Sequence, residues 1–294
     1  MYNKALLIYN GNVGQAEIET IFKTIVPILS KGISHLMLSK TEKEGDAELI
    51  VKNSGEAYDL LISLGGDGTL HEVINGIALL DNPPILGILP AGTCNDFARS
   101  LNIPLNLDEA AENILKGKSK PINIGKVNDR YFTNFVGVGL ITDIAENINS
   151  EVKNKLGKMS YYTSTIKSLG EKEQFDFELK TENEDLKGKA GMIIVLNGFY
   201  AGTTLVPVKA LDLQDDLFDV FIVYEAGFSL LMKYLTQKEQ FEKVVLDSEI
   251  KHIQANEIKI NTKQKMSIDT DGEIYLETPI DIKVLNKKIE FIIG

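Results

Sequence analysis

An apolar run that ends in three closely spaced glycines constrains this chain more than any other stretch. Residues 60–64 read Leu-Leu-Ile-Ser-Leu, and Gly65, Gly66, Asp67 and Gly68 follow directly. A tight turn needs one or two glycines, so three of them indicate that another group approaches the backbone closely. A glycine-rich loop between a strand and a helix also presents N–H groups at a helix N-terminus, which favours phosphate. The alternative is a simple strand-to-helix turn.

The first part of the chain alternates apolar runs with helical patterns. Four apolar runs predict strands, at residues 5–9, 34–39, 59–64 and 84–90. Helical spacing of apolar residues follows these runs, for example from Ile18 to Leu29. Strands that are apolar throughout and alternate with helices are typical of a parallel sheet covered on both faces. We therefore expect an α/β domain over residues 1–125.

After Pro121 the pattern changes to short β-like runs separated by turn signals. The expected strands lie at 175–181, 190–197, 218–224, 257–261, 266–269, 273–276, 280–285 and 289–293. Helical segments are expected within 142–169 and 227–240. This pattern predicts a second, β-rich antiparallel domain over residues 126–294. Whether its last strand packs back on the first domain stays open.

Three glycine-bearing loops, residues 10–14, 65–69 and 91–95, each follow a predicted parallel strand. The carboxyl ends of such strands share one edge of the sheet, where ligands bind. Three loops at one edge favour a phosphate site over three unrelated turns. No Gly-Lys-Ser/Thr follows the glycines, and His71 stands where a dinucleotide fingerprint has its third glycine. A carboxylate at Asp67 then suggests a cation, Mg²⁺, between it and the phosphates; the alternative is that Asp67 forms a turn or caps the next helix.

Charge and cysteine content narrow the function classes. The 294 residues carry a formal net charge of −11, which argues against a nucleic-acid partner. Cys94 is the single cysteine, so no intrachain disulfide can form and a reducing cytoplasm fits. The start does not resemble a signal peptide, and no apolar run approaches the roughly 18 residues of a membrane span. We expect a soluble, cytoplasmic protein.

Near the C-terminus, three carboxylates flank a strong hairpin-turn signal. Asp271-Gly272 lies between two β-like runs, with Asp269 before it and Glu273 after it. Like charges this close are expected to raise at least one pKa, which suits a general base. A solvated polar turn is the alternative.

Three sequence elements resemble one enzyme family. GGDGT at residues 65–69, with Glu72 and Asn75-Gly76 after it, resembles the signature of diacylglycerol kinases, sphingosine kinases, NAD kinases and, more loosely, phosphofructokinases. LPAGTCNDFAR at residues 89–99 resembles an element of the lipid-kinase branch, and DTDGE at 269–273 resembles its D-x-DGE element. Order and spacing are similar to those of bacterial diacylglycerol and lipid kinases over essentially the whole chain. The resemblance implies a phosphofructokinase- and NAD-kinase-like first domain, ATP, Mg²⁺ and phosphorylation of a lipid hydroxyl.

The resemblance also implies individual roles. Nucleotide contacts fall on Asn10, Gly11, Asn12, Val13, Gly14, Thr41, Gly65, Gly66, Gly68, Thr69, Glu72, Gly92, Thr93 and Asn95. Glu273 matches the family's proposed general base, Asp271 is its acidic neighbour, and Asp67 joins them as the anchor of Mg²⁺ or its water. A structural Mg²⁺ site matches Asp212, Asp215 and the carbonyl of Leu217.

The chain departs from the family pattern in two places. Asn-Gly-Asn-Val-Gly at residues 10–14 replaces the usual Asn-Pro-x-x-Gly, which suggests a more flexible loop. Asp216 stands where the metal segment usually has glycine.

A chain of this charge must still reach its lipid substrate. Lys153, Lys155 and Lys158 form a local basic segment with Tyr161 and Tyr162 close by. We expect this segment to contact anionic lipid, so that the enzyme works transiently at the inner face of the membrane. A solvated helix face is the alternative. A homodimer is one expectation for the assembly, although the sequence leaves oligomeric state open.

Two other functions remain possible on the same motifs. NAD kinases share GGDGT but lack the LPxGTxNDFAR element. A non-catalytic nucleotide sensor would keep the glycine loops and lose the base, whereas Glu273 is present.

Overall fold

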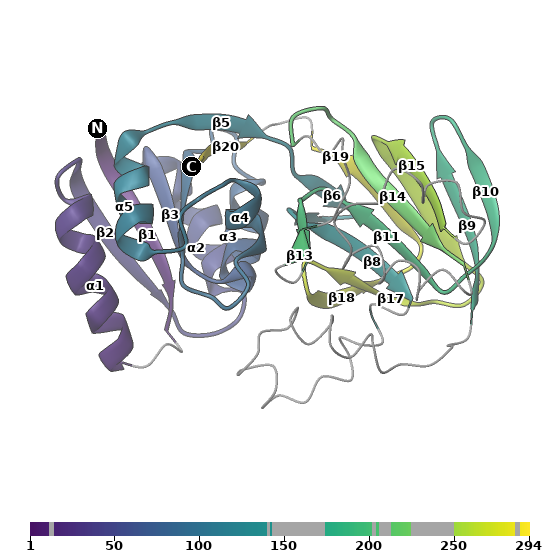
Figure 1. The fold of residues 1–294 in the computed structure, drawn as a ribbon. Helices are drawn as coiled ribbons and strands as arrows, with labels where there is room; N and C mark the ends of the chain where they lie inside the picture. The colour runs from purple at the N-terminus through teal and green to yellow at the C-terminus, as the bar shows by residue number, and fades with distance from the viewer. Residues whose placement is uncertain are drawn as a thin grey trace. The chain divides into compact units, whose positions relative to one another are not determined.

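The computed structural model describes residues 1–11, 15–139, 142, 174–201, 204–205, 213–224, 250–285 and 289–294. Apart from Thr142, the two regions expected to be helical, 142–169 and 227–240, lie outside the described residues. The chain forms two compact units (Figure 1), Met1–Ile122 with Asn286–Gly294, and Asn123–Leu285.

The first unit is built on a six-stranded sheet. Its strands are, in spatial order, β2 (Ile33–Thr41), β1 (Tyr2–Asn10), β3 (Leu60–Gly65), β4 (Ile85–Pro90), β20 (Ile289–Ile292) and β5 (Ser119–Ile122). Strands β1 to β4 are parallel to one another, as predicted. The last strand of the chain, β20, pairs parallel with β4 and antiparallel with β5. It therefore belongs to the sheet of the first unit.

Helices connect the parallel strands. They are α1 (Gln15–Leu29), α2 (Asp46–Ser54), η1 (Gly55–Ala57), α3 (Asp67–Ile77), α4 (Asp96–Ser100) and α5 (Leu107–Lys116). Helix α1 contacts α5 and α2 contacts α3, and α3 and α5 also contact the central strands β3 and β4. Strand β3 is buried along nearly its whole length, because helices cover both faces of a parallel sheet.

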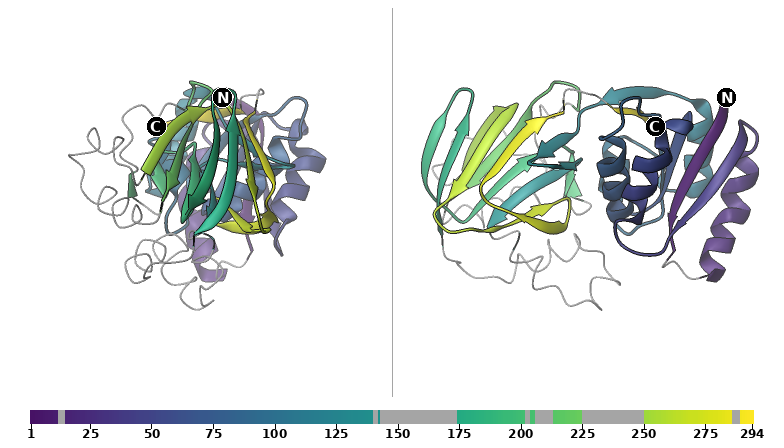
Figure 2. Two further views of the ribbon diagram at one scale, coloured as in Figure 1. Left: turned by 90° about the vertical axis from the view of Figure 1, so that its right-hand side faces the viewer. Right: turned by 180° about the vertical axis from the view of Figure 1, so that it is seen from behind.

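The second unit contains two six-stranded antiparallel sheets (Figures 1 and 2). The first consists of β10 (Asp185–Ala190), β9 (Phe175–Thr181), β16 (Glu257–Thr262), β19 (Ile280–Val284), β6 (Gly125–Val127) and β7 (Arg130–Phe132). The second consists of β15 (Ile250–Ala255), β14 (Phe218–Val223), β11 (Met192–Leu196), β8 (Phe135–Gly139), β17 (Ser267–Thr270) and β18 (Glu273–Glu277). A short ladder joins β12 (Tyr200–Ala201) and β13 (Thr204–Leu205).

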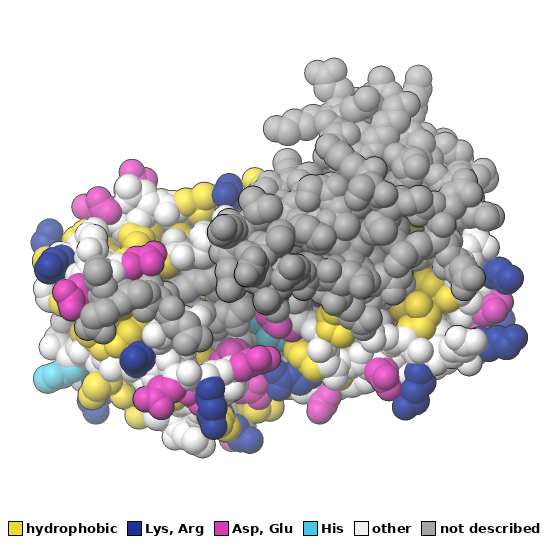
Figure 3. Space-filling view, turned by 90° about the horizontal axis from the view of Figure 1, so that it is seen from below, with side chains coloured by type: hydrophobic (Ala, Val, Ile, Leu, Met, Phe, Trp, Pro, Cys, Tyr) yellow, Lys and Arg dark blue, Asp and Glu magenta, His cyan; other side chains and the backbone are white. Residues whose placement is uncertain are grey.

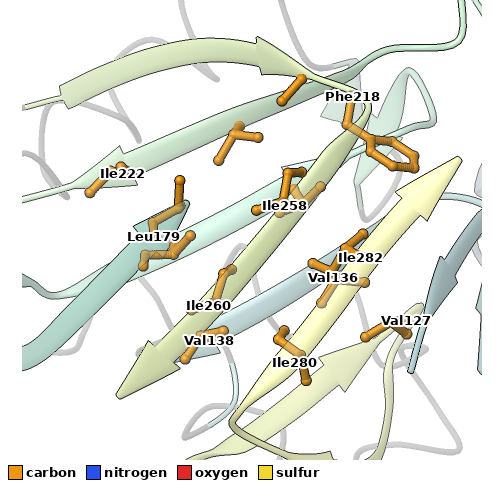
Figure 4. Packing of buried hydrophobic residues seen from close by; sticks show 14 of the residues in the cluster. Val127, Val136, Val138, Leu179, Phe218, Ile222, Ile258, Ile260, Ile280 and Ile282 are labelled. Carbon is orange, nitrogen blue, oxygen red and sulfur yellow. The ribbon is translucent and has the colours of Figure 1, made fainter. Parts of the chain in front are cut away.

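One hydrophobic core lies between these two sheets (Figure 4). Leu179, Ile258 and Ile260 come from the first sheet, and alternate residues of β8 and β14 face them from the second. This alternation is the period-2 pattern of a strand with one face in the core. The expected fold class, an α/β domain followed by a β-rich antiparallel domain, is confirmed.

None of the helices in the described part of the chain combines the length and apolar character that crossing a bilayer demands.

Candidate functional site

The carboxyl ends of β1, β2, β3 and β4 share one edge of the first sheet, because the four strands are parallel. Asn10 is in register with Thr41, and Gly65 with Pro90. The Gly11 N–H donates to the Thr41 carbonyl at 3.0 Å, and a Cβ on Gly11 would lie 2.1 Å from that oxygen. The ends of β1 and β2 therefore touch through a position that only glycine fits. Asn12, Val13 and Gly14 lie outside the described residues.

The glycines after β3 are explained largely by a second loop. A Cβ on Gly92 would lie 2.4 Å from the Gly66 Cα, and one on Gly66 would lie 3.1 Å from the Gly92 Cα. The loops after β3 and β4 thus meet backbone to backbone. Gly65 has another reason to be glycine, since its Cβ would lie 2.7 Å from the Cβ of Thr69. The close approach predicted from the sequence exists, and the approaching group is the other loop.

Asp67 ties the two loops together. Gly66 is the N-cap residue of α3, and Asp67 is the first residue of the helix. Its Oδ1 accepts a hydrogen bond from the Asp96 backbone N–H at 2.9 Å, across 29 residues of sequence. Sequence reasoning considered a cation or a local cap for this carboxylate and missed the link to α4. No pattern within the GGDGT motif could have revealed a partner so distant in the chain.

The loop after β4 is braced by its own asparagine. Asn95 adopts a left-handed backbone with φ of +53°, which asparagine tolerates better than most residues. Its Oδ1 accepts from the Gly92 N–H at 3.0 Å, and its Nδ2 donates to the Gly92 carbonyl at 2.8 Å. Asn95 itself is buried, whereas Gly92 and Thr93 are exposed. The loop is thus rigidly held while presenting Gly92 and Thr93 to solvent.

Glu72, which the sequence predicts to contact nucleotide, makes a structural contact with the neighbouring helix. Its Oε2 accepts from the Ala47 backbone N–H at 3.0 Å, in the first turn of α2. A carboxylate at a helix N-terminus satisfies an N–H that has no partner within the helix. Glu72 therefore joins α3 to α2, beside the exposed Gly68 and the half-buried Thr69.

In the second unit, the predicted hairpin turn joins β17 to β18. Asp271 and Gly272 have φ of +53° and +91°, as a tight hairpin turn requires. Asp271 is only 8% exposed, and its carboxylate accepts four hydrogen bonds of 2.7–3.1 Å. The donors are the backbone N–H groups of Thr133, Asn134 and Phe135 and the Thr133 hydroxyl.

Asp269 is fully buried, and its Oδ1 accepts from the Gly272 N–H at 2.7 Å. The three acidic side chains therefore do not form a solvated cluster, since two are buried and held by donors.

Glu273 lies half-buried at the start of β18, opposite Thr270. The register between β17 and β18 shifts after Ile268, which pairs with Leu276 while Asp269 pairs with Ile274. Tyr275 is the extra residue of this bulge. Bulges of this kind re-aim side chains and are frequent beside active sites.

A tyrosine and an arginine lie close to the hairpin. The Tyr275 side chain is 42% exposed, and the Arg130 Cζ lies 5.0 Å from the centre of its ring. Partial burial raises the pKa of Tyr275 above its usual value, and a hydrogen bond from Arg130 opposes that rise. Sequence reasoning identified neither Arg130 nor the bulge.

The expected metal segment is described only in part, because Asp212 lies outside the described residues. Asp215 Oδ1 accepts from the Leu217 N–H at 3.0 Å, and Asp216 adopts a left-handed backbone with φ of +62°. A left-handed backbone favours glycine, which explains why the sequences that this chain resembles usually have glycine at this position. Within the described ranges, no group of three or more His, Cys, Asp or Glu residues could hold a metal ion. A carboxylate and a carbonyl oxygen are nevertheless ligands that Mg²⁺ accepts.

Two family models cover most of the chain. Residues 4–127 match the diacylglycerol kinase catalytic domain, and residues 134–293 match the YegS C-terminal NAD kinase beta sandwich-like domain.

Relatives and solved structures match over the full length. A Staphylococcus aureus (strain Newman) protein named "Putative lipid kinase" is 36% identical over 99% of this chain and 97% of its own. A crystal structure from Bacillus anthracis str. Sterne, described as a "putative diacylglycerol kinase", has a TM-score of 0.90 at 36% identity, covering 100% of this chain and 96% of that one. A structure described as a diacylglycerol kinase from the same organism has a TM-score of 0.84 at 33% identity, covering 100% and 97%.

The two-unit fold and the matched family models place the chain among kinases that have an α/β catalytic domain and a β-sandwich domain. The chain belongs to the diacylglycerol kinase and lipid kinase family.

Proposed function

We propose that this protein transfers the terminal phosphoryl group of ATP to a lipid hydroxyl, with Mg²⁺, and acts in phospholipid metabolism. The observation that carries the proposal is the apposition of Gly66 and Gly92, with Asp67 linking their loops. This arrangement holds two loops rigidly at the ligand-binding edge of the sheet, and the family match supplies the reaction class. Diacylglycerol is the first acceptor to test.

The first unit would hold the nucleotide. Backbone N–H groups at the start of α3, and the exposed Gly68, Gly92 and Thr93, would contact phosphate oxygens. Asn10, Gly11 and Thr41 lie at the same edge and would contact the rest of the nucleotide, with Asn12 to Gly14. Gly65, Thr69, Glu72 and Asn95 would act mainly by shaping these loops, because their contacts are within the protein.

Mg²⁺, when bound, would offset the negative charge of the phosphates. Asp67 has a half-buried carboxylate at the nucleotide edge, whose Oδ1 is held by the Asp96 N–H. Its role would be to anchor this ion or a water on it. Asp212, Asp215 and the Leu217 carbonyl would hold a separate structural Mg²⁺.

The second unit would supply the general base, Glu273, which takes the proton from the lipid hydroxyl. Phosphoryl transfer needs in-line positioning more than covalent help, so the base must be held in place. Asp271 would serve as a positioning residue. Its four accepted hydrogen bonds fix the turn immediately before Glu273 to Thr133 and Asn134, which lie between β7 and β8, and to Phe135, the first residue of β8.

The enzyme would work from the cytoplasm, transiently at the inner face of the membrane. On the face shown in Figure 3, described basic side chains are interspersed with acidic ones and form no large basic patch there. Lys153, Lys155 and Lys158, outside the described residues, are our candidates for the membrane contact.

The proposal is tested by ATP consumption with and without dispersed diacylglycerol, followed by a screen of lipid hydroxyls with labelled ATP. Label should appear in a lipid product only with Mg²⁺ present. Label in no lipid, while nucleotide still binds, would refute the proposal and favour a nucleotide sensor.

NAD kinase is the second candidate because the second unit matches a domain described as NAD kinase beta sandwich-like. An arm of the same assay with NAD as the acceptor separates the two. Phosphorylated NAD without phosphorylated lipid would reverse our assignment.

A further inference from the structure

The segment 133–135 leads into β8 and is held from two sides within the second unit. In the sheet, β8 has β11 on one side and β17 on the other (Figure 1). Asn197 and Gly198 follow the last residue of β11, and Asp271 follows the last residue of β17. Asn197 and Gly198 therefore meet the segment 133–135 from one side, and Asp271 meets it from the other.

Two consecutive peptide groups of this segment accept hydrogen bonds from one side and donate to the other. The first group consists of the Thr133 carbonyl and the Asn134 N–H. Its carbonyl accepts from the Asn197 Nδ2 at 2.8 Å, and its N–H donates to the Asp271 Oδ1 at 2.8 Å. A side-chain amide on β11 is thus joined to the hairpin carboxylate through a single peptide group.

The second peptide group consists of the Asn134 carbonyl and the Phe135 N–H. Its carbonyl accepts from the backbone N–H groups of Asn197 and Gly198 at 2.8 and 3.0 Å. Its N–H donates to the same Asp271 oxygen at 2.9 Å. The connection from β11 to the hairpin is therefore made twice, in adjacent peptide groups.

The geometry of the peptide group carries this hold across β8. A trans peptide group is planar, so a contact that fixes the direction of its carbonyl also fixes the direction of its N–H. Hydrogen bonds in a chain also polarise one another, so a carbonyl that accepts makes the N–H of its group a better donor. Asn197 thus orients two of the four donors that hold Asp271.

Asn197 is itself held firmly in place. Its side chain is buried, and its Nδ2 also donates to the Asn123 carbonyl at 3.1 Å. Gly198 leaves no space for a side chain, because a Cβ there would lie 2.7 Å from the Asn134 Oδ1 and 3.2 Å from the Asn134 Cα. The end of β11 therefore lies in close contact with the segment that supplies the donors.

We propose that Asn197 is a positioning residue for phosphoryl transfer, which orients the donors of Asp271 and, through Asp271, the turn that carries Glu273. This role rests on the proposed function, in which Glu273 is the general base. Loss of the Asn197 amide should misplace the base without removing any group that reacts. A small misplacement of a reacting group can cost roughly 10²-fold in rate.

A double-mutant cycle of turnover tests this role. Asn197→Asp keeps the size of the side chain but removes the donor, so it should lower turnover by roughly 10- to 100-fold. In the Glu273→Gln background it should lower turnover by less than about twofold, because the base that it would misplace is already gone. A purely structural loss would lower turnover equally in both backgrounds, and that result would overturn the proposal. Nucleotide affinity should not change in any of these variants.

Asn113→Asp is the matched control. Asn113 is similarly buried, in the first unit, and its Nδ2 donates to the Ile293 carbonyl at 3.0 Å. Its substitution should change turnover by the same factor in both backgrounds. If Asn197→Asp does not fold, Asn197→Ala and Asn113→Ala take their places with the same expectations, because alanine removes the donor without burying a charge.

Hydrogen exchange measured by mass spectrometry provides a readout that needs no turnover. Asn197→Asp should speed exchange in peptides that cover 131–136 and 267–277, and Asn113→Asp should not. Exchange in β16, residues 257–262, should stay the same in both variants. Unchanged exchange at 267–277, or faster exchange throughout the second unit, would overturn the proposal. If the unsubstituted chain labels no lipid, the proposed function fails, and the exchange result still decides whether Asn197 holds the turn.

Discussion

Two carboxylates, one in each unit, make structural hydrogen bonds in addition to the roles proposed for them in the reaction. Asp67 accepts the Asp96 N–H, and Asp271 accepts four donors from the segment 133–135. A simple alanine substitution would remove both functions together. Variants that keep the hydrogen bond and remove the charge are therefore more informative.

The pair Asp67→Asn and Asp67→Ala separates these functions. Asparagine keeps an oxygen that can accept the Asp96 N–H, so the unfolding free energy should change little, whereas alanine should lower it by about 1–2 kcal/mol. Both should reduce turnover by roughly 10²-fold or more, because neither can anchor Mg²⁺ or its water as a carboxylate does. Urea unfolding and turnover at saturating Mg²⁺ are the measurements. If the asparagine variant keeps its activity, Asp67 only ties the loops.

Glu273→Gln keeps the size and shape of the side chain but cannot take a proton as a carboxylate does. Turnover should fall by about 10²- to 10⁴-fold, the usual contribution of general-base catalysis. Nucleotide affinity, measured by calorimetry, should not change, because the nucleotide loops belong to the first unit. A fall of less than about tenfold would exclude the general-base role. Joint loss of turnover and nucleotide affinity would instead point to a structural role.

Asp271→Asn is expected to lower the stability of the fold, whereas Glu273→Gln is expected to lower turnover. Its carboxylate accepts from donors on both oxygens, so an amide would direct its own N–H toward one of them. The free energy of unfolding should fall by about 1.5–3 kcal/mol, as for a lost hydrogen bond to a charged group. Urea denaturation measures this directly. Unchanged stability would show that the turn before Glu273 does not depend on Asp271.

At the scale of elements, the loops after β3 and β4 are one structure rather than two. Gly92→Ala would place a methyl group 2.4 Å from the Gly66 Cα, which forces the loops apart. Nucleotide binding should weaken at least about tenfold. The fold should be retained, because the substitution lies in a loop and leaves the packed core of the sheet unchanged. Calorimetric titration with ATP is the measurement. Gly188→Ala is the control, since its new methyl would meet Phe177 only at 3.7 Å, an ordinary contact.

At the scale of the whole molecule, the question is whether a chain of net charge −11 binds an anionic membrane through the proposed basic segment. Each of Lys153, Lys155 and Lys158 should contribute on the order of 1 kcal/mol near the surface. Replacing all three by glutamate should therefore largely abolish co-sedimentation with phosphatidylglycerol-containing vesicles. Lys31, Lys43 and Lys120 are exposed in the first unit, and their triple replacement by glutamate changes the net charge equally. Equal loss in both variants would show that net charge matters and the segment does not.

Local sequence pattern predicted most elements of the first unit, because each buried parallel strand is apolar throughout and each helix shows its own period. In the second unit it missed β6, β7, β8, β10, β12, β13 and β15. β6 and β7 have three residues each, too few to show a period. β10 pairs with β9 alone and is mostly polar, because an edge strand contributes little to the core.

The fold class, the glycine loops at one sheet edge and the Asp271-Gly272 turn could all be predicted from the sequence, because each depends on residues adjacent in the chain. What those residues contact depends on the folded arrangement and could not be predicted. Gly66 meets Gly92, Asp67 holds Asp96, and β20 returns to a sheet begun at Tyr2. The turn at Asp271 is likewise held by donors more than 130 residues earlier. Such contacts arise when packing brings together backbone segments that are far apart in the sequence. The periodicity of residues along the chain does not predict which segments will meet.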